Sequence, residues 1–294
     1  MTAPAYLFLK CGAFGLRTLA RLYGQIISRP DATWRIPSRD VDRTIKAHVY
    51  QPKSRRKDIS LPVLINFHGS GFVIPAHGSD DDFCRQVSQQ TGYSVLDIQY
   101  RLAPEHPFPA ALEDVEDVVN WVRTQPKKFN LQRIAMSGFS AGGNLALAAS
   151  STLFPPGTFR SVISFYPSVE CFLDPDNLVA PESGGKPLPP FAIRLFKQCY
   201  LQSKVDARDP RVSPALADPN RFPTNVLIIS AGYDSLAPEA ERLAQNLQKH
   251  STRYVVHKRM ERCDHGWDKL AKKGGRGWEL KEKAYASAIS MLLR

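Results

Sequence analysis

The chain has 294 residues, of which 43% are hydrophobic and 23% are charged, a composition typical of a globular protein with a large core. The formal net charge of +11 is concentrated at the two ends, but no zinc-finger spacing or RNA-binding aromatic signature accompanies it, which argues against a nucleic-acid-binding module. The five cysteines are odd in number and include no C-x-x-C pair, which argues against a disulfide scaffold and for a reducing compartment.

The N-terminal residues 5–27 are apolar but lack the pattern of a secretory signal. No basic segment precedes the first apolar run, and three basic residues interrupt it: Lys10, Arg17 and Arg21. We expect an amphipathic helix, with Leu7, Phe14 and Leu22 among its apolar positions, that packs on the protein or lies on a membrane. Without a convincing signal peptide or membrane span, the sequence predicts a cytoplasmic protein, and membrane contact is left open but not favoured.

Short apolar runs then alternate with helical patterns. We expect strands at residues 43–50, 61–67, 93–99, 132–137, 161–166, 225–231 and 253–258, and helices at 236–249 and about 278–293. Continuous apolar runs such as Val226–Ile229 are typical of strands that are buried on both faces. The alternation predicts an α/β fold with a mostly parallel central sheet flanked by helices.

The strand at residues 61–67 leads into His68-Gly69-Ser70-Gly71-Phe72. A glycine-rich loop after a strand can direct backbone N–H groups toward an anion, such as the oxyanion of acyl transfer. A plain turn is the simpler alternative. A phosphate-binding loop is disfavoured because the G-x-x-x-x-G-K-[ST] pattern is absent.

The segment Gly138-Phe139-Ser140-Ala141-Gly142 has the pattern G-x-S-x-G. An apolar strand precedes it and an Ala/Leu-rich helix follows, which is the context in which this motif presents a nucleophilic serine. Such a turn is so tight that the residues two before and two after the serine must lack side chains. The alternative is a Gly/Ser-rich turn without chemistry.

Residues 168–222 form a long insertion rich in Pro and Gly, with one helix-like stretch at Phe191–Leu201. Insertions of this kind are often lids or caps, although a surface excursion remains an alternative. We expect the walls of the substrate pocket to come from this insertion and from the N-terminal segment.

Two further residues complete a nucleophilic site. In hydrolases with this motif the chain order is serine, acid, histidine, and Asp234 and His265 both lie in turns just after predicted strands. The other histidines precede the serine, lie on strands or end a helix: His48, His68, His77, His106, His250 and His257. The competing acids are less suitable, because Asp264 is adjacent to His265 and the other two lie in the insertion: Asp206 and Asp209.

Several motifs occur in the order found in the hormone-sensitive-lipase family of α/β-hydrolases, which this chain resembles and which includes microbial carboxylesterases and the arylacetamide deacetylase type. They are His68–Phe72, Tyr100–Glu105, Phe108–Asp114, Gly138–Gly143, Asp209–Pro214 and Ala231–Asp234, and they cover most of residues 60–270. The resemblance implies an α/β-hydrolase domain over residues 41–294 with a helical cap insertion at about 168–222. The N-terminal residues 1–40 would be a helical segment that is part of the cap.

Where the family usually reads H-G-G-G, this chain has His68-Gly69-Ser70-Gly71. The resemblance implies that the backbone N–H groups of Ser70, Gly71 and Ala141 form an oxyanion hole. Ser70 departs from the family pattern but keeps its N–H group, and it would be strained only if the position required positive φ. His68 is expected to hold the loop by hydrogen bonding.

These residues predict a serine hydrolase that cleaves carboxylic esters of small hydrophobic substrates through an acyl-enzyme, with Ser140 as nucleophile, His265 as base and Asp234 as orienting acid. No cofactor is expected, and no metal, because the His, Cys and Asp residues show no zinc-ligand spacing. The alternatives are a lactone or amide hydrolase, an acyltransferase or a dehydratase-like enzyme. A ligand-binding receptor on the same fold is disfavoured, because the plant gibberellin receptor of this kind lacks the histidine that is present here.

Overall fold

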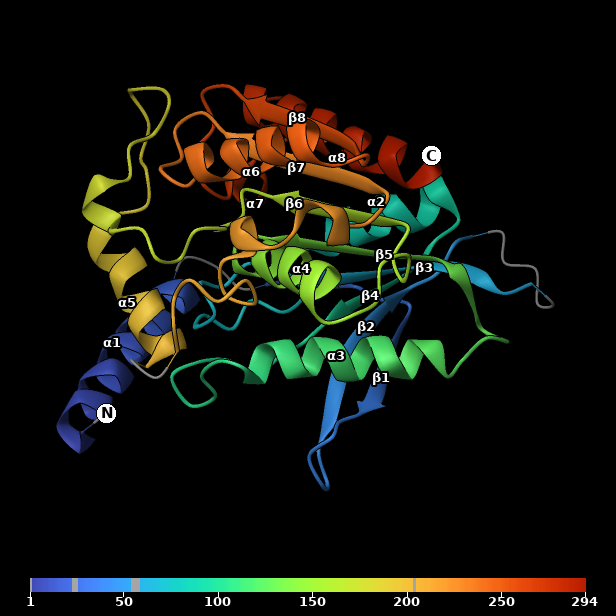
Figure 1. Ribbon diagram of the computed structural model, residues 1–294, viewed down its shortest axis with the longest axis horizontal. Coiled ribbons are helices and arrows are strands. Elements are labelled where there is room, and N and C mark those ends of the chain that lie inside the picture. The colour runs from blue at the N-terminus through green and yellow to red at the C-terminus, as the bar shows by residue number, and fades with distance from the viewer. Residues whose placement is uncertain (1, 23–25, 54–58, 203–204) are drawn as a thin grey trace.

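The computed structural model describes residues 2–22, 26–53, 59–202 and 205–294, and it centres on one eight-stranded sheet (Figure 1). The strands lie in the order β1-β2-β4-β3-β5-β6-β7-β8. Their bounds are β1 Ala32–Pro37, β2 Thr44–Tyr50, β3 Leu61–Phe67, β4 Ser94–Ile98, β5 Phe129–Phe139, β6 Ser161–Phe165, β7 Asn225–Ala231 and β8 Tyr254–Met260. Strand β2 is antiparallel to β1 and β4, whereas β4, β3, β5, β6, β7 and β8 are all parallel to one another, which confirms the expected mostly parallel sheet.

Helices cover both faces of the sheet. One face packs against α3 (Ala110–Arg123), α4 (Ala141–Thr152) and α6 (Ala237–His250), and the other packs against α2 (Asp81–Thr91) and α8 (Arg276–Leu293). Shorter elements are η1 Pro175–Asn177, η2 Pro214–Leu216, η3 Pro219–Arg221 and α7 Trp267–Leu270. Strands β4, β6 and β7 are buried along their whole length, because a helical layer covers each face of the sheet.

The sheet begins earlier than the sequence analysis expected. Residues 1–40 were expected to precede it, but β1 lies within that segment and pairs with β2 from Ala32 opposite Val49 to Pro37 opposite Thr44. Strand β1 lies at the edge of the sheet and buries only Ile36 fully, so it lacks the continuous apolar run that marks the central strands. Its Trp34 packs against Trp121 of α3, with ring centroids 5.9 Å apart.

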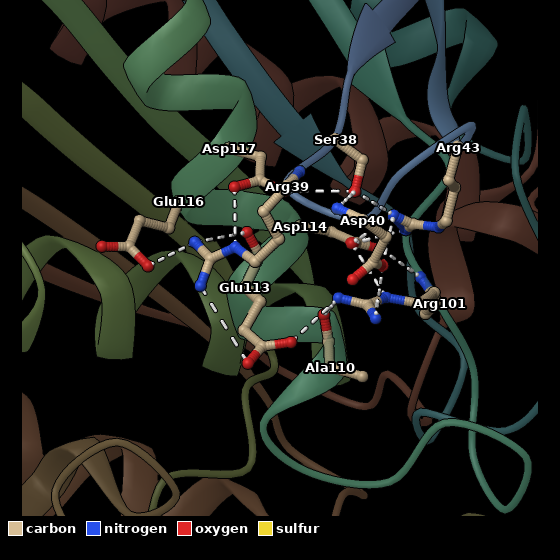
Figure 2. Close-up of polar contacts among 10 residues, drawn as sticks. All are labelled: Ser38, Arg39, Asp40, Arg43, Arg101, Ala110, Glu113, Asp114, Glu116 and Asp117. Carbon is tan, nitrogen blue, oxygen red and sulfur yellow. Dashed lines mark hydrogen bonds and ion pairs between the residues drawn. The ribbon is translucent and has the colours of Figure 1, made fainter.

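A network of charged side chains fastens the β1–β2 hairpin to α3 (Figure 2). Arg39 Nε donates to Asp117 Oδ1 over 2.8 Å, and the same guanidinium pairs with Glu116. Asp114 is fully buried and accepts hydrogen bonds from Arg43 Nη1 and from Arg101 Nε, each over 2.9 Å. A carboxylate without access to water needs such partners, so this network joins the hairpin, α3 and the segment after β4.

Two helices outside the sheet layers pack against each other: α1 (Ala3–Leu22) and α5 (Pro190–Leu201), the latter within the insertion at 168–222 (Figure 1). The buried residues of α1 are Leu9 and Ala13. The apolar side chains singled out from the sequence are exposed instead: Leu7, Phe14 and Leu22. No helix in the described part of the chain is long and apolar enough to cross a membrane.

Candidate active site

Ser140 occupies a sharp turn between the end of β5 and the start of α4. Its φ of 52° and ψ of −117° are unusual for a residue with a side chain, and they store strain at this position. A Cβ at Gly138 would lie 2.2 Å from the carbonyl oxygen of Gly142, and a Cβ at Gly142 would lie 2.0 Å from that of Phe67. Both positions of the motif therefore require glycine, because the start of α4 lies too close to the end of β5 at Gly138 and too close to the end of β3 at Gly142 for any side chain.

The structure brings Ser140, His265 and Asp234 together. The Oγ atom of Ser140 lies 2.9 Å from Nε2 of His265, and Nδ1 of His265 lies 2.7 Å from Oδ2 of Asp234. Asp234 follows β7 and is fully buried, and His265 lies in the turn between β8 and α7. With Asp234 accepting the Nδ1 proton, the Nε2 lone pair faces the hydroxyl of Ser140, so the imidazole can take the serine proton.

The competing acidic residues have other partners. Asp264 accepts a hydrogen bond from the backbone N–H of Lys186, over 2.6 Å. Asp206 and Asp209 cap turns in the insertion, where they accept from the backbone N–H groups of Arg208 and Arg211. Asp234 is therefore the carboxylate that the described structure places against His265.

The loop after β3 is organised around Ser70. Its Oγ accepts a hydrogen bond from the backbone N–H of Phe72 over 2.8 Å and lies 2.7 Å from Oη of Tyr100. Since Tyr100 Oη donates its single proton to the carbonyl of His68, Ser70 is the donor to Tyr100. Positive φ falls on Gly71 and on Phe72, at 55° and 63°, so Ser70 does not carry the backbone strain considered from the sequence.

This loop faces the serine turn. No backbone carbonyl among the described residues accepts from the N–H groups of Ser70, Gly71 or Ala141, so all three donors remain available to a ligand. His68 is buried, and its ring stacks on that of Tyr100 with centroids 4.4 Å apart. Burial lowers the pKa of His68 to about 4, so its imidazole is neutral at physiological pH.

Ser140 and His265 open into a cavity of about 290 Å³ whose walls are mostly apolar. The lining residues include Phe72, Leu188, Ile193, Phe196, Leu201 and Leu236. Four of these six belong to the insertion at 168–222, as expected. The N-terminal segment contributes no lining residue in its described part, which contradicts the expectation that it would form a wall.

Two residues beside the candidate active site, Tyr166 and Lys269, were not predicted from the sequence. Tyr166 packs edge-on against His265 with ring centroids 4.8 Å apart, and its Oη donates to Asp268 Oδ1 over 2.6 Å. Lys269 lines the cavity, with Nζ 2.7 Å from Asp80 Oδ1 and 2.9 Å from Asp268 Oδ2. Burial alone would lower the pKa of Lys269, but the two carboxylates outweigh it and hold this pKa above its ordinary value. The only signal in the sequence was position: Tyr166 directly follows β6, and Lys269 lies one helical turn after His265.

The parallel sheet, its two helical layers and the strand–serine–helix turn define an α/β-hydrolase. Residues 64–269 match the family model described as "alpha/beta hydrolase fold", and the chain belongs to this family, in the hormone-sensitive-lipase-like group that its motifs indicated.

Curated relatives and solved structures agree with this placement. The chain is 31% identical over 222 residues to "Esterase LipI" of Mycobacterium tuberculosis, covering 72% of this chain and 68% of the relative. It is 33% identical over 242 residues to "Carboxylic ester hydrolase LipN" of the same organism, covering 79% and 63%. The chain thus spans about two thirds of the length of these relatives.

Among solved structures, the carboxylesterase EstE1 from a metagenomic library superposes with a TM-score of 0.77 at 28% identity, over 97% of each chain. The esterase of Pyrobaculum calidifontis superposes with a TM-score of 0.75 at 29% identity, over 98% of this chain and 93% of the other.

Proposed function

We propose that this chain hydrolyses carboxylic esters of small hydrophobic substrates, with Ser140 as nucleophile, His265 as general base and Asp234 as the acid that orients His265. The observation that carries the proposal is the continuous hydrogen-bonded series from Asp234 through His265 to Ser140, over 2.7 and 2.9 Å, at the wall of an apolar cavity. Ester hydrolysis is also the activity named for its relatives, including the ethyl acetate hydrolase of Pseudomonas putida, to which it is 29% identical over 70% of this chain and 66% of the relative.

The first chemical step is acyl transfer to the serine. As the Ser140 oxygen attacks the ester carbonyl, His265 Nε2 takes the hydroxyl proton and then gives it to the leaving alkoxide. The alcohol leaves and an acyl-serine remains. Water then attacks the acyl-serine with His265 again as the base, which releases the carboxylic acid and returns the proton to Ser140.

Asp234 acts by position and charge. It is fully buried and accepts from Nδ1 of His265, and its second oxygen accepts from the backbone N–H of Leu236 over 3.0 Å. These bonds select the imidazole tautomer that has its lone pair on Nε2, and the carboxylate stabilises the imidazolium formed during attack.

The negative oxygen of the tetrahedral intermediate requires donors already in place. The backbone N–H groups of Ser70, Gly71 and Ala141 supply them in this proposal, and the N-terminus of α4 adds its positive end. The Ser70 hydroxyl does not contact the oxyanion in this proposal. Its hydrogen bonds to Phe72 and Tyr100 hold the loop that presents the donors.

The cavity supports substrates of modest size. Its volume of about 290 Å³ lies at the lower end of the range for ligand pockets, and its walls offer few polar partners. A short acyl chain with a small alcohol fits this description better than a long-chain triglyceride.

The test is hydrolysis of p-nitrophenyl acetate, butyrate, octanoate and laurate by the wild-type chain and by Ser140→Ala. We expect highest activity on the shorter esters and a decrease in kcat of at least about 10⁴-fold in the variant. Ser150→Ala, on the same helix but outside the cavity lining, is the matched control and should remain active. An inactive wild-type chain whose Ser140 does not react with a fluorophosphonate probe would contradict the proposal.

A further inference from the structure

The outer face of α1 carries large apolar side chains that no described part of the chain covers. Five of them are more than half exposed, at 53% to 78%: Leu7, Phe8, Phe14, Leu19 and Leu22. At about 100° per residue they fall within one arc of about 140° on the helix surface. The remaining residues of that arc are uncharged: Pro4, Cys11, Gly15 and Thr18. Contiguous apolar surface of this kind marks an interaction site.

The orientation of α1 is determined by its opposite side. Leu9 and Ala13 are buried in a cluster with Val73 and Cys199, the latter on α5. Arg17 adds polar anchors, donating to the carbonyl oxygens of Val73 and Ala103 over 3.0 and 2.9 Å and pairing with Glu105. The helix is thus attached to the body of the protein with its apolar arc directed outward.

Positive charge borders the apolar arc. Within residues 2–22 there are three basic side chains and no acidic one, and the basic residues Lys10, Arg17 and Arg21 follow one edge of the arc. Arg17 and Arg21 also line a groove that runs toward the β1–β2 edge of the sheet. Its other basic residues are Arg35, Arg43, Lys46 and Arg101, and its one acidic lining residue is Glu105.

We propose that α1 docks this protein on a membrane surface that contains anionic lipid. The helix lies parallel to the surface, with its apolar arc at the boundary of the acyl chains and with Lys10 and Arg21 at the headgroups, while Arg17 stays paired with Glu105. Anionic headgroups complement Lys10 and Arg21 at the basic edge and Arg35 and Lys46 in the groove, whereas Arg43 and Arg101 are already paired with Asp114. A second copy of the chain offers no such complement, because pairing two α1 faces would bring like charges together.

Docking places the candidate active site close to the lipid. Helix α5, against which α1 packs, contributes Ile193 and Phe196 to the cavity wall. A hydrophobic ester dissolved in the membrane would therefore be concentrated beside this wall. The docking itself does not depend on the proposed hydrolysis and is tested by binding alone.

Cys11 makes the test direct. It lies on the apolar arc and is the one exposed cysteine, whereas Cys84, Cys171, Cys199 and Cys263 are buried. The full chain is labelled at Cys11 with an environment-sensitive fluorophore (NBD) and mixed with vesicles of phosphatidylcholine alone or with 30% phosphatidylglycerol. We expect a blue shift with increased emission, and flotation of the protein, with the anionic vesicles.

Matched variants distinguish binding through the apolar arc from nonspecific adsorption to the vesicles. Leu7→Glu/Phe14→Glu should weaken partitioning at least tenfold, because both side chains are well exposed in the arc. Val41→Glu changes an 89% exposed residue in the β1–β2 turn and should bind as the wild type does. Lys10→Gln/Arg21→Gln should lower partitioning by about fivefold per charge at low salt. Circular dichroism and p-nitrophenyl acetate hydrolysis without vesicles verify that each variant is folded.

Three results would overturn the proposal. One is the absence of a spectral shift with anionic vesicles. Another is binding that Leu7→Glu/Phe14→Glu does not weaken. The third is a wild-type chain that does not bind vesicles but forms a dimer, detected by light scattering, which the double substitution dissociates. In that case the arc would be an interface between two copies of the chain.

Discussion

Gly71 lies where the candidate oxyanion loop meets the cap. Its φ of 55° is in the left-handed region, and a Cβ at this position would lie 2.6 Å from the ring of Phe196 on α5. Alanine at position 71 therefore meets two penalties, a backbone conformation that L-residues disfavour and an overlap with an aromatic ring. The backbone N–H of the same residue is one of the proposed oxyanion donors, so any shift of the loop moves that donor.

The two penalties can be estimated separately. The left-handed conformation costs an alanine about 1 kcal/mol relative to glycine. The overlap with Phe196 adds overpacking strain of about 1–3 kcal/mol, which the loop relieves by moving away from α5. Displacing one oxyanion donor lowers kcat by about 10²–10³-fold. We therefore expect Gly71→Ala to fold with reduced stability and to lose about two to three orders of magnitude in kcat.

Gly92 supplies the matched control. Its φ is 75°, and a Cβ there would meet nothing within 4 Å, so Gly92→Ala carries the backbone penalty without the overlap. Thermal unfolding and p-nitrophenyl butyrate kinetics are measured for both variants, and Gly92→Ala should keep full kcat. Gly71→Ala/Phe196→Ala should regain part of the lost activity relative to Phe196→Ala alone. A folded Gly71→Ala variant with wild-type kcat would refute the placement of this loop at the oxyanion.

Three further predictions follow from buried carboxyl groups. Asp234→Asn should lower kcat about 10⁴-fold, because its amide favours the wrong imidazole tautomer. Asp264 is adjacent to His265 in the sequence but accepts a hydrogen bond from the backbone of the insertion, so Asp264→Asn should change kcat by no more than about twofold. Asp114→Asn should destabilise the fold by about 3–5 kcal/mol in urea unfolding, because it leaves the guanidinium groups of Arg43 and Arg101 without their buried anion. Glu116→Gln, at the more exposed end of the same network, should cost at most about 1 kcal/mol. Equal effects of the two substitutions would contradict this ranking. Burial raises the pKa of Glu239 from 4.5 to about 7, so the folded protein binds this proton more tightly than the unfolded chain does. The free energy of unfolding should therefore decrease by up to about 3 kcal/mol as the pH rises from 4.5 to 7. Urea unfolding at a series of pH values measures this slope, which Glu239→Gln should flatten.

The serine turn was predictable because its requirements are local. Residues 138–142 specify that a strand ends, a helix begins and no side chain fits at Gly138, whose close approach is to Gly142 in the same turn. The close approach at Gly142 is instead to Phe67 of β3. The buried strands were also predictable, since continuous apolar runs need cover on both faces. The placement of Asp234 and His265 followed from the rule that ligands bind where parallel strands end.

Other features depended on contacts that the sequence does not encode locally. Strand β1 is recognisable only by its pairing with β2, because an edge strand buries too little to show an apolar run. Lys269 resembles a surface lysine in sequence. It becomes a partly buried cavity residue because Asp80, just before α2, and its own neighbour Asp268 both lie within ion-pair distance of its Nζ.

Helix α1 illustrates the same division. The sequence indicated an amphipathic helix, but three of the apolar residues it suggested are exposed, and a different side, with Leu9 and Ala13, packs on the protein. An apolar pattern states that a helix has a face to bury and does not state against what. By itself the sequence determined the fold class and the strand–serine–helix turn, and it predicted that Ser140, Asp234 and His265 lie together, because these follow from short-range geometry and strand order. Only the tertiary structure decided the cavity walls, the buried ion pairs and the outward face of α1, because each depends on residues that lie far apart along the chain.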